Sequence, residues 1–231
     1  MAEPTSDEAA DARRAVVRRA VSVGVAPSLY GFSLGALGVT SGLSIWQTCA
    51  TSLLLFSGGS QFALIGVLGG GGSAASAITA SSLLGIRNGL YGLTLNEIVR
   101  PHGLRRLAAA QLTIDESTAV AISQRTPELR RLGFWVTGSM IFVVWNLTTL
   151  AGALAGNALG DPRKFGLDAA ASGAFIALLW PRLTAREPVA VAICAAIVTA
   201  ALVPAVPVGL PVVAAGLVAV AAGALRRARP A

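Results

Sequence analysis

Residues 133–158 read GFWVTGSMIFVVWNLTTLAGALAGNA, a stretch without a single charged side chain. An α-helix needs about 20 consecutive, mostly apolar residues to cross the hydrocarbon core of a bilayer, and this stretch exceeds that length. A membrane β-barrel would instead show segments of about ten residues in which polar and apolar side chains alternate. The stretch therefore predicts a membrane-embedded α-helix.

Apolar stretches of this kind recur along the whole chain. They lie at about residues 20–41, 44–71, 74–98, 107–124, 133–158, 166–181, 188–206 and 208–225. The stretch at 107–124 is the weakest membrane segment because it contains Gln111, Asp115, Glu116 and Gln124. We predict an all-α, polytopic helical membrane protein with seven or eight membrane-embedded segments and at least one broken or re-entrant helix.

The composition of the 231-residue chain agrees with this fold class. Hydrophobic residues make up 54% of the chain and charged residues only 13%, whereas an average soluble domain has about 25% charged residues. These values exclude a disordered chain and argue against an ordinary soluble enzyme, whose helices need a polar outer face. The net charge of +7 comes from arginines at the ends of apolar stretches. That distribution is typical of membrane flanks, so we expect a lipid bilayer rather than nucleic acid as the partner.

The chain divides into one membrane domain with short polar ends. We expect a cytoplasmic N-terminal tail over residues 1–19, a single transmembrane transport domain over 20–225 and a basic C-terminal tail over 226–231. Arginines gather in Arg13–Arg19 and in Arg226–Arg229, and basic residues mark the cytoplasmic side of a membrane protein. The predicted location is therefore the cytoplasmic (inner) membrane, with multiple passes and a cytoplasmic N-terminus.

Two further arginine-rich loops constrain the topology. They lie at Arg100–Arg106 and at Arg125–Arg131, on either side of the weak segment 107–124. If every segment crossed the membrane, these loops would face opposite sides. Both face the cytoplasm if the segments 44–71 and 107–124 are re-entrant or broken. The alternative is that every segment spans and the charge bias of the loops is weak.

Gly58, Gly59, Ser60 and Gln61 interrupt the apolar segment 44–71 near its middle. Adjacent glycines favour departure from the helix, and unwound backbone at membrane depth is tolerated only where it lines a cavity or is buried in protein. In transporters such half-helix ends bind substrates and ions. We predict substrate binding here, by N–H groups to a carboxylate and C=O groups to an ammonium group. The alternative is that the small residues only let helices pack closely.

Arg87 and Asn88 lie in the middle of the apolar segment 74–98. A charge so far from either membrane surface is costly, and it indicates a functional site in which the arginine faces the bundle interior and pairs with an acid. Asn88 is the polar neighbour expected to share its cavity. The alternative for Arg87 is a purely structural ion pair.

Asp115 and Glu116 are the acids that Arg87 can meet. Adjacent residues of a helix lie about 100° apart, so one carboxylate can pair with Arg87 while the other faces water or a second polar group. Desolvation favours the protonated form of a carboxyl group, which suits proton coupling. We predict that this pair couples transport to protons or ions. The alternative is a cytoplasmic amphipathic helix with a solvated acidic face.

Asn146 follows Trp145 in the middle of the stretch 133–158. We include Asn146 among the substrate-binding residues, although an asparagine at this depth also serves to hydrogen-bond across helices. The chain contains no phosphate-binding loop motif, no credible Ser-His-Asp grouping and too few clustered ligands for a metal. We therefore predict no catalytic residue, no metal and no cofactor, and a protein that is not an enzyme.

Several stretches match a known family in order along the chain. They are GFSLGAL at 31–37, GLSIWQ at 42–47, SLLLFSGGSQF at 52–62, RNGLYG at 87–92 and LTIDE at 112–116. The fourth resembles an Arg-His-x-x-Tyr-Gly element and the fifth a Thr-Asp-Glu element. Over roughly residues 22–160 the chain thus resembles the AzlC family, the large subunit of branched-chain amino acid exporters.

The resemblance implies export of small neutral amino acids such as valine, leucine and isoleucine. It also implies a partner, a small second membrane protein of the AzlD type. Relatives are often described as permeases of an ATP-driven system. Because this chain has no nucleotide-binding motif, we expect a secondary carrier driven by an ion gradient.

The chain departs from the family pattern at three positions. Asn88 replaces the histidine that usually follows the arginine, Gly85 replaces an asparagine, and Ile114 stands between Thr113 and Asp115. Asparagine does not titrate, so position 88 cannot relay protons as a histidine could. Two other functions stay open: a non-transporting membrane scaffold or assembly subunit, and a channel.

Overall fold

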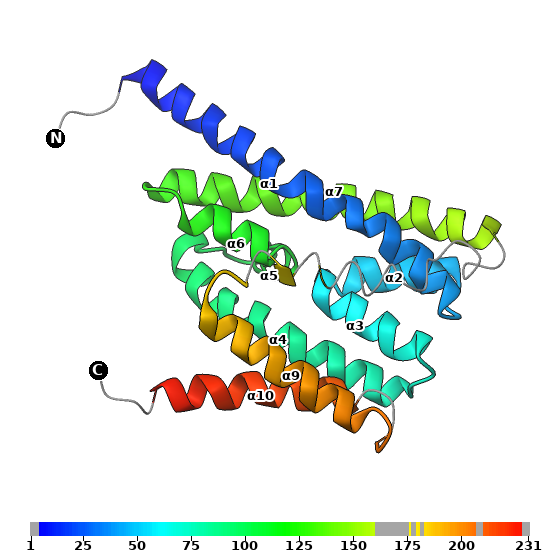
Figure 1. Cartoon of the computed structure of the whole chain (residues 1–231). Coiled ribbons are helices and arrows are strands. Elements are labelled where there is room, and N and C mark those ends of the chain that lie inside the picture. Colours follow the sequence, from blue (N-terminus) through cyan, green and yellow to red (C-terminus); the bar gives the residue numbers. More distant parts are fainter. Residues whose placement is uncertain (1–4, 160–175, 177–178, 181–182, 207–209, 228–231) are drawn as a thin grey trace.

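The computed structural model describes residues 5–159, 176, 179–180, 183–206 and 210–227. The regular elements in this part of the chain are α-helices (Figure 1), which confirms the all-α prediction. The predicted segment 166–181 lies almost wholly outside the described residues. The helices are α1 (Ser6–Thr40), α2 (Ile45–Leu54), α3 (Gly58–Gly69), α4 (Ala74–Val99), α5 (Arg105–Gln111), α6 (Asp115–Ile122), α7 (Pro127–Leu159), α9 (Arg186–Leu202) and α10 (Leu210–Arg227).

Local signals in the sequence explain where several helices begin and end. Ser44 and Gln47 form a reciprocal capping box at the start of α2, and the hydroxyl group of Ser73 caps α4. Gly71 has a φ of +83° in the turn before α4, a conformation that glycine adopts without strain. At the far end of α4, Arg100 is left-handed, with φ at 49°, and Pro101 follows it.

Two long helices, α1 and α7, pack closely against each other in parallel. Small residues make this possible: a Cβ atom on Gly35 would overlap with the backbone of Thr149, and one on Gly152 would overlap with the backbone of Phe32. Gly24 lies correspondingly near Ile141 at the other end of the contact. Glycine allows this close approach of helix backbones in membrane proteins.

The polar tail expected over residues 1–19 is helical from Ser6 onward and continues directly into the apolar part of α1. Thr5 caps this helix, and the carboxylate of Glu8 accepts a hydrogen bond from the backbone N–H of Thr5. The physical reason is that a capping box stabilises the start of a helix even where its side chains are polar.

The predicted segment 44–71 folds as a hairpin of two helices, α2 and α3, which we call the first hairpin. Ser41, just before α2, lies against Gly69 at the end of α3, so the chain enters and leaves the hairpin on the same side of the molecule (Figure 1). The helix is interrupted at 55–57, where Leu55 and Ser57 are not helical. We expected unwound backbone at 58–61, and this was wrong: those residues form the first turn of α3.

The weak segment 107–124 folds as a second hairpin, made of α5 and α6 with its turn at 112–114. Arg131, at the start of α7, donates a hydrogen bond from Nε to the carbonyl of Ile98 near the end of α4, at 3.3 Å. The entry to the second hairpin and the exit from it therefore lie at one end of the molecule. Figure 1 shows that this end is opposite to the one where the first hairpin enters.

The tips of the two hairpins meet. Gln111 donates a hydrogen bond from Nε2 to the carbonyl of Leu53 at 2.7 Å, which joins the end of α5 to the end of α2. In each half of this region a long helix is followed by a hairpin: α1 by the first hairpin and α4 by the second. The two halves thus repeat one pattern in opposite directions. Inverted repeats of this kind are frequent in transporters.

Three arginine clusters share one end of the molecule. Val16 of α1 lies near Gly133 of α7, and Arg131 bonds to the end of α4. The clusters at 13–19, 100–106 and 125–131 are therefore gathered at the same end, on the left in Figure 1. The two segments that were predicted to be re-entrant or broken, 44–71 and 107–124, fold as the two hairpins.

Among the residues that the structure describes, two helices are long and apolar enough to cross a membrane: α1 and residues Pro127–Ala158 of α7. The short apolar helices Gly58–Gly69 and Ala214–Leu225 are not long enough by themselves. The number of membrane-embedded segments, seven or eight, stays a prediction.

Candidate functional site

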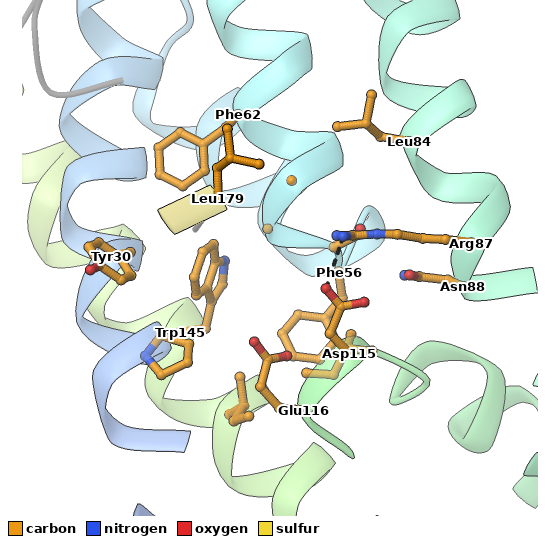
Figure 2. Close-up of a pocket in the computed structure, with 16 residues that line it drawn as sticks. Tyr30, Phe56, Phe62, Leu84, Arg87, Asn88, Asp115, Glu116, Trp145 and Leu179 are labelled. Carbon is orange, nitrogen blue, oxygen red and sulfur yellow. Dashed lines mark ion pairs between the residues drawn. The ribbon is translucent and has the colours of Figure 1, made fainter. Parts of the chain in front are cut away.

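A cavity of about 230 Å³ lies where the hairpin tips meet α1, α4 and α7 (Figure 2). This volume is below the roughly 300–1,000 Å³ of cavities that bind drug-sized ligands, so it suits a small solute. Aromatic and aliphatic side chains form one part of the wall, and polar groups form the other. The lining residues are Pro27, Tyr30, Phe56, Ser57, Gly58, Gly59, Phe62, Leu84, Arg87, Asn88, Ile114, Asp115, Glu116, Ile141, Trp145 and Leu179.

The Arg87–Asp115 ion pair forms the polar part of the wall. The distance from Nη1 of Arg87 to Oδ2 of Asp115 is 2.9 Å, and the side chains are 34% and 21% exposed. Neither group is in bulk water, and neither is sealed from the cavity. The expected pairing of Arg87 with one of the two acids is confirmed, and Asp115 is the partner. Glu116 lines the same cavity (Figure 2).

The start of α6 holds Asp115 in place. Asp115 is the first residue of α6, where the partial positive charge of the helix N-terminus favours a carboxylate. The turn before it is fixed by the buried hydroxyl group of Ser117. This group donates to the carbonyl of Leu112 at 2.6 Å and accepts from the N–H of Ile114 at 3.1 Å. A short, internally bonded turn thus aims the carboxylate at α4.

The first turn of α3 faces the same cavity without a side-chain cap. Ser57 makes no capping bond to α3, because its hydroxyl group donates to the hydroxyl oxygen of Ser60 at 3.1 Å. A Cβ atom at Gly59 would lie 3.0 Å from Nη2 of Arg87, and one at Gly58 would lie 3.1 Å from the Trp145 ring. The glycines therefore let the helix start touch the two cavity side chains. The backbone N–H groups of such a start can bind an anion.

Three predicted binding residues do not line the cavity. Ser60 and Gln61 are fully buried within the first hairpin. Gln61 donates from Nε2 to the carbonyl of Thr51 at 3.1 Å and so links the two arms of the hairpin. Asn146 donates from Nδ2 to the carbonyl of Phe142, one turn earlier in its own helix, at 2.7 Å. The structure thus gives Gln61 a structural contact within the hairpin.

The aromatic part of the wall was not predicted. Tyr30, Phe56, Phe62 and Trp145 come from α1, the first hairpin and α7 and line the cavity. Figure 2 shows Tyr30, Phe62 and Trp145 on one side and Phe56 beside Asp115. One signal could have indicated Trp145: it lies in mid-stretch, whereas membrane tryptophans are enriched at the two interfaces. Among the described residues, no group of three or more His, Cys, Asp or Glu side chains is placed to hold a metal ion.

The sequence model of the family described as AzlC protein matches residues 21–159, more than half of the chain. The chain belongs to the AzlC family. The part that matches the AzlC family contains both hairpins, α4 and α7, and every lining residue of the cavity except Leu179. The hairpins and the cavity thus lie in the region that defines AzlC proteins.

A curated relative supports the assignment to a membrane family. A protein of Archaeoglobus fulgidus, named as an uncharacterized membrane protein, is 34% identical to this AzlC protein over 161 residues. The alignment covers 68% of this chain and 69% of the relative. No solved structure matches the chain. This AzlC protein is therefore a membrane protein, and its family is consistent with a transport-related role.

Proposed function

We propose that this AzlC protein is a secondary carrier that exports branched-chain or similar small neutral amino acids. In this proposal it lies in the cytoplasmic membrane and works with a small AzlD-type subunit. The observation that carries the proposal is the cavity itself. An uncapped helix start, a second helix start with two acids and the Arg87 guanidinium group all face one small space between two hairpins.

The charge arrangement of the cavity suits a zwitterion. The first turn of α3, with the N–H groups of Gly58 and Gly59, is the place for a carboxylate. Acceptors for an ammonium group are the carboxylates of Asp115 and Glu116 and the side-chain oxygen of Asn88. That oxygen is buried and has no partner among the described residues. The aromatic part of the wall then contacts the apolar side chain of the amino acid substrate.

The ion pair offers a route for coupling transport to a gradient. Nε of Arg87 is buried and makes no hydrogen bond within the described part of the chain, so the guanidinium group has capacity for a further acceptor. A substrate carboxylate that binds Arg87 weakens the Arg87–Asp115 ion pair. Asp115 or Glu116 can then exchange a proton. The hairpins, joined at their tips, are the elements that would move between inward and outward states.

Counterflow of labelled leucine in proteoliposomes tests the proposal, with the chain alone and together with its small AzlD-type partner. We expect saturable exchange that depends on the leucine inside the vesicles. Linear, non-saturating flux would indicate a channel, and no flux in either preparation would indicate a scaffold.

Substitution of Arg87 tests the role of the ion pair. Arg87→Ala leaves Asp115 without its cation, and we expect the exchange rate to fall by roughly tenfold or more, the factor that corresponds to about 1.4 kcal/mol. Arg14→Ala is the matched control, because the Arg14–Asp11 pair on α1 is 82% and 76% exposed. A rate for Arg87→Ala equal to that of Arg14→Ala would remove the ion pair from the mechanism.

A further inference from the structure

Trp145 has a hydrogen-bond donor with no partner. Its side chain is 5% exposed, and Nε1 is buried without a hydrogen bond in the part of the chain that the structure describes. Buried polar groups are nearly always hydrogen-bonded, so an unpartnered indole N–H in the wall of a cavity indicates a ligand. The proposed function above makes no use of this group.

Packing fixes the position of the Trp145 ring. The ring packs edge-to-face on Phe62, with ring centroids 6.4 Å apart, and its tip lies 3.1 Å from the place of a Cβ atom on Gly58. In the view of Figure 2, the indole lies between the aromatic side of the cavity and the Arg87–Asp115 pair, with its nitrogen turned toward the pair. The six-membered ring of the indole is thus held against the first turn of α3.

The chemistry of the donor restricts the ligand. An indole nitrogen only donates, so the ligand group that it meets must be an acceptor. The adjacent N–H groups of Gly58 and Gly59 are also donors, and a helix start favours negative charge. Figure 2 shows the carboxylate of Asp115 at Arg87, and that of Glu116 between Asp115 and Trp145. An anionic acceptor with two oxygens fits the donors around Trp145.

We propose that Trp145 is a substrate-binding residue whose indole N–H donates a hydrogen bond to the substrate carboxylate. This inference rests on the proposed function and makes it more specific. A free carboxylate is then required for binding. Leucine is accepted, whereas leucinamide and the amine that leucine yields on loss of its carboxyl group are rejected.

Fluorescence of Trp145 tests this directly, without changing the residue. Trp46, Trp135 and Trp180 are replaced by phenylalanine in the full chain, so that Trp145 is the only tryptophan. We expect leucine to change the emission in a saturable way and leucinamide and the amine to leave it unchanged. Equal responses to leucine and leucinamide, or no response to leucine, would overturn the inference.

A transport measurement complements the fluorescence. Trp145→Phe keeps a ring against Phe62 and removes the N–H, and we expect the KM for leucine in counterflow to rise by about tenfold, as for a lost hydrogen bond to a charged group. Trp135→Phe is the control, because Trp135 packs on Phe134 and does not line the cavity. A wild-type KM in Trp145→Phe contradicts the inference and leaves the transport function intact. If the unmodified protein carries no leucine, the transport function itself fails.

Discussion

Gly58 and Gly59 show how single residues shape the site. Glycine inside a helix is less stable than alanine by roughly 0.5–1 kcal/mol, yet two glycines form the first turn of α3. The space beside them is already filled by Arg87 and by the ring of Trp145. Their small size is therefore needed for contact between the helix start and the cavity side chains.

Gly59→Ala tests this role. The new methyl group would lie 3.0 Å from Nη2 of Arg87, so the guanidinium group must shift, and we expect a several-fold lower rate of leucine exchange. Gly66→Ala on the same helix has nothing within 4 Å and should raise the free energy of unfolding by about 0.5–1 kcal/mol with unchanged exchange. Exchange rates and thermal melting of both variants check the prediction. Equal exchange rates would show that the contact with Arg87 is unimportant.

At the scale of elements, each hairpin turn depends on side-chain hydrogen bonds. Interrupted helices leave backbone N–H and C=O groups without helical partners. In the first hairpin, Gln61 bonds to the carbonyl of Thr51 in the opposite arm. In the second hairpin, Ser117 bonds on both sides of the turn. The turns are thus built from local polar residues, and these residues hold the cavity groups at a defined position.

Ser117→Ala should weaken the second hairpin. The change removes the partner of the Leu112 carbonyl and of the Ile114 N–H, in a buried place, and we expect a loss of about 1–3 kcal/mol in the free energy of unfolding. The exchange rate should fall with it, because Asp115 loses its fixed position. Ser123→Ala, at the other end of α6, removes a bond to the carbonyl of Val120 and one accepted from Nε2 of Gln124, both away from the turn, and serves as the control. Identical melting of the two variants would contradict the prediction.

At the scale of the whole molecule, the contact between α1 and α7 supports both hairpins. The contact depends on helix backbones that approach without side chains between them. Gly152→Leu would drive a side chain into the backbone of Phe32, and we expect a strong loss of folded protein in detergent-based size-exclusion chromatography. Gly89→Leu on α4 has open space around it and should give the normal yield. A folded, monodisperse Gly152→Leu protein would show that the helices can separate locally.

The opposite entry of the two hairpins predicts a membrane topology. In a background without Cys49 and Cys194, a membrane-impermeant thiol reagent should label His102→Cys and Arg125→Cys from one side. It should label Gly70→Cys from the other side, because the first hairpin enters there. Labelling of His102→Cys and Arg125→Cys from opposite sides would mean that α5 and α6 cross the membrane.

The amino-acid sequence alone was sufficient for the helical class, for the membrane environment and for two interrupted segments. These follow from apolar length, low charge and glycine or acidic residues within apolar stretches, all of which are local properties. The sequence also indicated Arg87 and its two candidate acids, because a charge in an apolar stretch is costly wherever the chain folds.

Only the tertiary structure decided which of these residues share a cavity. In helices that are apolar on all sides, side chains that face lipid and side chains that face the interior have the same character, so periodicity does not show which way a residue points. Gln61 therefore looked like a binding residue but lies inside a hairpin, and Trp145 looked unremarkable among apolar neighbours but lines the cavity. The meeting of Asp115 with Arg87 depends on how far the second hairpin reaches toward α4, and that distance is set by packing between segments remote in the sequence.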